Sequence, residues 1–100
     1  MRLSEKQILT IKNLIRDNFG EDAKLILFGS RLDDAGRGGD IDLLVLADFA
    51  EEELFLRKLK ALGQLQRALG DQKIDLLTAV PAAESPAEVV KIALKEGVSL

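Results

Sequence analysis

Two carboxylates open an otherwise apolar strand in the stretch from Leu25 to Val45, LILFGSRLDDAGRGGDIDLLV. Because alternate side chains of a strand share one face, Asp40 and Asp42 project together, away from Ile41 and Leu43. The rest of the strand is apolar on both faces, which is typical of a strand that is covered on both sides. Like charges in such a place repel each other and lose hydration. They require neutralisation, which a divalent cation supplies best because hard cations prefer oxygen ligands.

A Gly-Ser turn precedes the paired acids. Lys24 to Phe28 predicts a short buried strand that ends at Gly29. Glycine permits close approach of the backbone, and backbone N–H groups at the start of a following helix bind anions. Gly29 and Ser30 are therefore candidates for contacts with phosphate. Arg31 and Arg37 either add positive charge near a triphosphate or are ordinary solvated arginines.

A third acid, Asp75, interrupts the apolar strand predicted from Lys73 to Ala79, KIDLLTA. If this strand neighbours the one that holds Asp42, the three carboxylates converge on one face. Such a cluster can hold two divalent ions, which stabilise the attacking and the leaving oxygens of an in-line displacement. Asp40 and Asp42 would bind the metals, and Asp75 would complete the site and accept a proton from the attacking hydroxyl. The alternative is that the acids are paired with basic residues, for which Lys73 is the sole candidate on these strands.

Three helices are predicted around the strands. Ser4 to Gln7 is a capping box for a helix that ends near Phe19, and Ser85 to Glu88 is a second capping box, for a helix that ends near Glu96. The longest helix is predicted over Glu51 to Leu69. Its apolar face is expected to contain Phe55, Leu59, Leu62 and Leu69, widened by Leu54, Leu56 and Leu65. Alternating helices and strands predict an α/β sheet of two or three layers, with parallel or antiparallel strands left open.

The composition limits the size of the fold, its partners and the groups available for catalysis. One hundred residues, 1–100, are expected to form a single domain. The net charge of −3 and the dispersed basic residues argue against direct binding of nucleic acid. The sequence has no cysteine and no histidine, so catalysis must use carboxylates, hydroxyls, Lys or Arg, and oxygen-bound metals. No apolar run approaches the ~20 residues of a membrane span, and no signal-peptide pattern is present, so a cytoplasmic protein is expected.

These features together resemble the nucleotidyltransferase superfamily that includes DNA polymerase beta. The resemblance is carried by Gly29-Ser30, by Asp40-Ile41-Asp42 after nine intervening residues, and by Asp75 on a later strand. Within that superfamily, GSR…GDIDLLV is similar to the minimal nucleotidyltransferases, small prokaryotic proteins of about this length. The resemblance covers the whole chain. The glycine-rich loop DDAGRGG departs from the family pattern.

The resemblance implies a polymerase beta-like fold, a small mixed β-sheet of three or more strands flanked by helices. It also implies MgATP as the donor, two Mg²⁺ ions, and transfer of AMP with release of pyrophosphate. By resemblance, the metal-binding pair maps to Asp40 and Asp42, the third carboxylate to Asp75, and the phosphate-contacting turn to Gly29 and Ser30.

The resemblance further implies a protein partner. Many minimal nucleotidyltransferases pair with a HEPN-domain protein, a small helical RNase-like toxin, and act as its antitoxin, some by transferring AMP to a tyrosine. Chain length independently favours a protein acceptor, because a sheet face committed to metals and nucleotide leaves little to enclose a small molecule. A homo- or hetero-oligomer is therefore expected. Two alternatives stay open: an antitoxin that neutralises its partner by contact alone, and a nucleotidyltransferase for a small acceptor such as an aminoglycoside.

Overall fold

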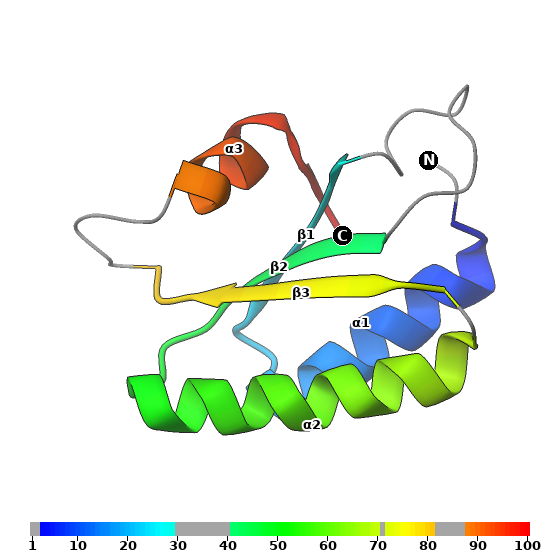
Figure 1. Cartoon of the computed structure of the whole chain (residues 1–100), viewed down its shortest axis with the longest axis horizontal. Coiled ribbons are helices and arrows are strands. Elements are labelled where there is room, and N and C mark those ends of the chain that lie inside the picture. Colours follow the sequence, from blue (N-terminus) through cyan, green and yellow to red (C-terminus); the bar gives the residue numbers. More distant parts are fainter. Residues whose placement is uncertain (1–2, 30–40, 71, 82–87) are drawn as a thin grey trace.

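Four strands form one sheet between two layers of helix in the computed structural model, which describes residues 3–29, 41–70, 72–81 and 88–100 (Figure 1). The strands are β1 (Lys24–Phe28), β2 (Ile41–Leu46), β3 (Ile74–Ala79) and β4 (Val98–Ser99). Helices α1 (Glu5–Phe19) and α2 (Glu51–Leu69) cover one face, and α3 (Glu88–Glu96) lies over the other. The α/β class and the flanking helices are confirmed.

The sheet is mixed, with strand order β3-β2-β1-β4. β1 pairs antiparallel with both β2 and β4, whereas β2 and β3 run parallel. The mixed sheet implied by the family resemblance is therefore confirmed. The sequence analysis did not predict β4, whose pairing with β1 is extended by a hydrogen bond from the backbone N–H of Leu100 to the carbonyl oxygen of Leu25, 2.8 Å long.

The alternation of side chains divides the interior into two clusters. Leu25, Leu27, Leu43 and Val45 belong to the cluster beneath α1 and α2. The intervening residues face α3, where Ile26, Phe28, Leu44 and Leu46 pack with Val90 and Ala93. Since side chains two residues apart share a face, Asp42 lies on the α3 side of the sheet with Leu44. The core residues Ile26 and Phe28 of the neighbouring strand β1 lie on the same side.

Helix α1 is built as its sequence predicts. The side chain of Ser4 accepts a hydrogen bond from the backbone of Gln7, whose own side chain accepts one from the backbone of Ser4. The helix is joined to α2 by Asn18, which is buried and donates from Nδ2 to Gln64 Oε1 at 2.7 Å. No helix in the described ranges has the length and hydrophobicity to cross a membrane. The second predicted capping box, at 85–88, lies mostly outside the described residues.

Helix α2 has the predicted bounds but a narrower buried face than expected. Its buried residues are Leu54, Ala61 and Leu65, and Leu62 and Leu69 are packed in part against the same cluster. The predicted core positions Phe55, Leu56 and Leu59 are exposed instead. The predicted stripe through Phe55 and Leu59 was therefore wrong, because the sheet and α1 cover the neighbouring arc of the helix instead, and apolar residues beside that arc stay at the surface.

Candidate active site

Two of the predicted acids lie directly opposite each other. In the parallel pairing of β2 and β3, Asp42 stands in register with Asp75. Neighbouring strands lie about 4.8 Å apart, and paired residues in register project to the same face. Both carboxylates therefore occupy the α3 side of the sheet, where Asp42 is half-buried and Asp75 is exposed. The condition stated from the sequence, that the two strands be neighbours, is met.

Gly29 brings the end of a third strand to the same place. It follows β1, whose last residue, Phe28, pairs with Asp42. Gly29 has a φ of +79°, a conformation that side chains disfavour. A Cβ atom here would overlap Oδ2 of Asp42 and would lie 3.0 Å from its Cγ. Glycine is thus required twice at this position, by its backbone conformation and by its closeness to the carboxylate.

Three predicted site residues, Asp40, Ser30 and Arg31, lie outside the described residues, as does Arg37. Within the described ranges, no group of three metal-ligating side chains is found. Asp42 and Asp75 are thus the described part of the predicted trio. Their oxygen donors fit a hard divalent cation, which takes carboxylates together with water or phosphate oxygens. The carboxylate of Asp42 takes up the position that a Cβ at Gly29 would occupy, so it lies directly against the backbone of that turn.

A cavity of about 410 Å³ opens at the two carboxylates. Its lining combines Asp42 and Asp75 with Lys58 and Leu62 of α2. Since β3 is an outer strand of the sheet, the cavity extends around its edge from the α3 side toward α2. Of the described lining residues, Lys58 alone is basic. No sequence pattern singles out Lys58, which is one of several cations spread along α2.

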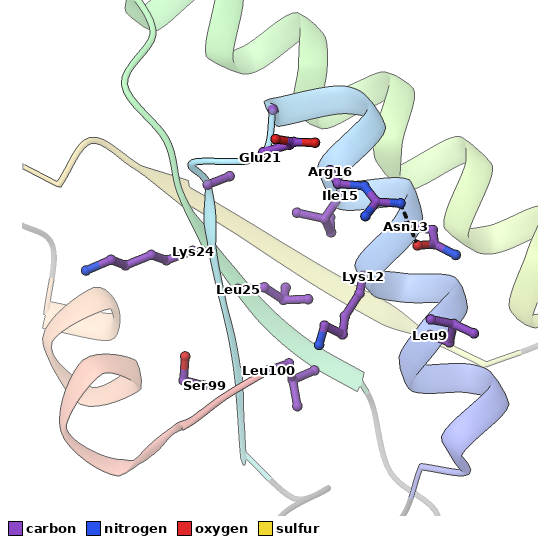
Figure 2. Close-up of a pocket in the computed structure, with 12 residues that line it drawn as sticks. Leu9, Lys12, Asn13, Ile15, Arg16, Glu21, Lys24, Leu25, Ser99 and Leu100 are labelled. Atoms are coloured by element: carbon purple, nitrogen blue, oxygen red, sulfur yellow. Dashed lines mark hydrogen bonds between the residues drawn. The ribbon is translucent and has the colours of Figure 1, made fainter.

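A second cavity, of about 420 Å³, lies between α1 and the strands β1 and β4 (Figure 2). Its walls carry three cations, Lys12, Arg16 and Lys24. Figure 2 shows the Nη2 atom of Arg16 donating a hydrogen bond to Oδ1 of Asn13, 3.0 Å long. Leu25, which lines the floor, belongs to the cluster beneath α1 and α2. This cavity therefore opens on the side of the sheet opposite to Asp42 and Asp75.

Comparison with known proteins places these features in a family context. Residues 8–100 match the family model of the nucleotidyltransferase domain. The chain is similar to one in a crystal structure of a toxin-antitoxin with AMP-PNP, at 28% identity and a TM-score of 0.66, covering 97% of this chain and 72% of that one.

A second similar structure holds a tri-AMPylated HEPN toxin of Shewanella oneidensis in complex with its MNT antitoxin. The identity is 26% and the TM-score 0.60, over 93% of this chain and 70% of that one. The toxin-antitoxin MntA-HepT, at 24% identity and a TM-score of 0.65, shares the fold over 96% of this chain and 70% of the other. No curated protein gives a significant match.

Proposed function

The chain belongs to the nucleotidyltransferase domain family, and we propose that it transfers AMP from ATP to a tyrosine hydroxyl of a HEPN-type partner and thereby acts as an antitoxin. The observation that carries this proposal is the register of Asp42 and Asp75 beside Gly29. The similar structures support the donor and the partner class, since one contains AMP-PNP and another an AMPylated HEPN toxin.

Divalent metal ions are typical of this family, and we assign Mg²⁺ to the carboxylates. Asp42 and Asp75 would hold it together with Asp40, two residues before Asp42 in the sequence. When bound, Mg²⁺ supplies charge neutralisation of the triphosphate and stabilises the oxygens that attack and leave. The chain offers carboxylates for this purpose and has neither histidine nor cysteine.

The turn after β1 is assigned to the triphosphate. Gly29 presents backbone without a side chain beside Asp42, so a phosphate can approach the main chain closely. We assign the hydroxyl of Ser30 and the guanidinium of Arg31 to hydrogen bonds with phosphate oxygens, which Arg makes in bidentate form. In this assignment, the nucleotide spans the end of β1 and the start of β2, with its α-phosphate next to the carboxylates.

The proposed step is an in-line displacement at the α-phosphorus. The acceptor hydroxyl oxygen forms a bond to the α-phosphorus, and the bond from that phosphorus to the oxygen bridging to the β-phosphate breaks. Pyrophosphate leaves, and AMP becomes attached to the acceptor. The hydroxyl proton passes to the Asp75 carboxylate, which is exposed beside Asp42 and acts as the general base in a chain that has no histidine.

A protein acceptor agrees with the position of the acids. Asp75 stands exposed on an outer strand, where a large partner can bring a side chain to it. Small-molecule sites, in contrast, bury most of their ligand in a concavity. The acceptor tyrosine is thus expected to be presented by the partner's own surface.

Transfer of label from α-³²P-ATP tests the function. The purified chain, its HEPN-type partner, ATP and Mg²⁺ are incubated with and without a chelator, and the proteins are separated. We expect label on the partner that is lost with the chelator. Complex formation without label would instead support an antitoxin that acts by contact. Label on an aminoglycoside in a parallel incubation, with none on the partner, would support a small acceptor.

A further inference from the structure

Exposed apolar side chains form a row along α2. Phe55 is 55% exposed and Leu59 is 49% exposed, and residues four apart lie on the same side of a helix. Leu62, half-buried, continues the row by three more residues. Single exposed apolar residues are common on protein surfaces, whereas contiguous ones mark sites of interaction.

This row runs beside the edge of β3, and it leads to the catalytic carboxylates. A cavity of about 550 Å³ at one end is lined by Phe55, Lys58 and Thr78. The cavity at the acids is lined by Lys58, Leu62 and Asp75. Lys58 borders both, so the surface is continuous, and Figure 1 shows α2 extending along β3 over the same length. We call it the α2–β3 surface: Phe55, Lys58, Leu62 and Thr78 line its two cavities, and the exposed Leu59 stands between Phe55 and Leu62 along the helix.

We propose that the α2–β3 surface docks a helix of the acceptor protein, with an apolar row on that helix flanked by basic residues. A protein whose hydroxyl reaches Asp75 must cover the surroundings of that residue, and the α2–β3 surface adjoins them through Lys58 and Leu62. An amphipathic helix packs its apolar face against such a row through residues at helical spacing. This inference rests on the proposed function, to which it adds the place and the chemistry of the contact.

Acidic residues at the far end of the surface indicate which charge the partner carries there. Glu51 and Glu52 line the cavity that holds Phe55 and are exposed. Their neighbour Glu53 is already paired with Arg57, at 2.7 Å. Two exposed carboxylates beside an apolar row favour a partner that carries Lys or Arg there, because complementary charge raises association rates and excludes partners of like charge.

The test removes the apolar row and compares it with a matched removal elsewhere. The double variant Phe55→Ser/Leu59→Ser is measured beside Leu9→Ser, which removes a side chain that is 59% exposed on α1. The Kd for the HEPN-type partner is measured by calorimetry, and AMP transfer is followed over a range of partner concentrations. Melting temperatures establish that both variants fold.

We expect the double variant to raise the Kd about tenfold or more, as truncation of a buried interface anchor does. Its rate of transfer should recover at saturating partner, so the loss is in KM, and Leu9→Ser should match the wild type. The charge reversal Glu51→Lys/Glu52→Lys should weaken binding too, chiefly through slower association.

The outcomes separate this inference from the function it rests on. Wild-type transfer with an unchanged Kd in the double variant would overturn the docking site and leave the function standing. If the wild type binds the partner but transfers no AMP, and the double variant binds more weakly, the docking site would be supported and the enzymatic function would not. Failure of the wild type to bind the partner would overturn both. A homodimer that the double variant dissociates would reassign the surface to a second copy and overturn the inference.

Discussion

Two cavities on opposite sides of the sheet are nearly equal in volume, about 410 and 420 Å³, and their linings are opposite in net charge. One lies at Asp42 and Asp75, where two strands bring acids into register. The other lies against α1, where Lys12, Arg16 and Lys24 surround an apolar floor (Figure 2). The difference teaches that volume does not locate the chemistry here. The carboxylates of the first cavity are set against each other by strand register, whereas the cations of the second are exposed residues of the ordinary surface.

The largest effect should come from removing one acid of the pair. Asp42→Asn is expected to lower the rate of AMP transfer on the order of a thousandfold, the equivalent of about 4 kcal/mol of transition-state stabilisation that the metal site supplies. The fold should survive, because Asp42 is only half-buried and the amide keeps its shape. Single-turnover rates and melting temperatures are measured together.

Asp48→Asn is the matched control, since Asp48 follows the opposite end of β2 and is exposed. It should transfer AMP at the wild-type rate. Activity retained in Asp42→Asn would remove the basis for placing the reaction at the β2–β3 cavity.

The next effect concerns the glycine that approaches Asp42. Gly29 and Gly70 share a φ of +79°, but a Cβ at Gly70 would meet nothing within 4 Å, whereas one at Gly29 would overlap the carboxylate. Alanine at either position should therefore cost about 1–2 kcal/mol of stability through backbone strain. Only Gly29→Ala should also lower transfer, on the order of a hundredfold, as a misplacement of about 1 Å does in other active sites.

Denaturant unfolding and transfer rates of the two alanine variants separate strain from misplacement. Equal activity of Gly29→Ala and Gly70→Ala would mean that the close approach to Asp42 has no part in the reaction.

The smallest effect is expected from a charge reversal, Lys to Glu, made once in each of the two cavities. Lys58→Glu adds a negative charge beside Asp42 and Asp75 and should raise the KM for ATP about tenfold, because like charges oppose the binding of a triphosphate. Lys24→Glu makes the same change in the other cavity. Its effect should stay within about twofold, since an exposed charge at a distance is screened by solvent and salt.

Steady-state kinetics at physiological ionic strength provide the comparison. If Lys24→Glu raised the KM for ATP tenfold and Lys58→Glu left it unchanged, ATP binding would belong to the cavity against α1 instead.

The local elements were predictable from the sequence because their signals are local. Lys24–Phe28 and Glu51–Leu69 have the predicted bounds, and β2 and β3 begin within one residue of theirs. Strand alternation also indicated a shared face for acids two residues apart. The sequence predicted the meeting of Asp42 and Asp75 only on the condition that their strands are neighbours. Which strands pair depends on the packing of the whole sheet, and local patterns do not determine it.

Three features were beyond the reach of local patterns. β4 has two residues and no periodicity. The closeness of Gly29 to Asp42 arises from strand pairing, which no spacing encodes. The exposure of Phe55 and Leu59 depends on how much of α2 the sheet and α1 cover, and an apolar stripe gives the same signal whether the chain itself or a partner covers it.

The intact mass of the HEPN-type partner after incubation with ATP and Mg²⁺ tests the central claim most directly. It is recorded beside Asp42→Asn and Asp48→Asn, at equal concentrations and times. We expect the wild type and Asp48→Asn to add whole AMP units to the partner and Asp42→Asn to add none. A partner that stays unmodified while it binds the wild-type chain would contradict an AMP-transferring role for the paired carboxylates.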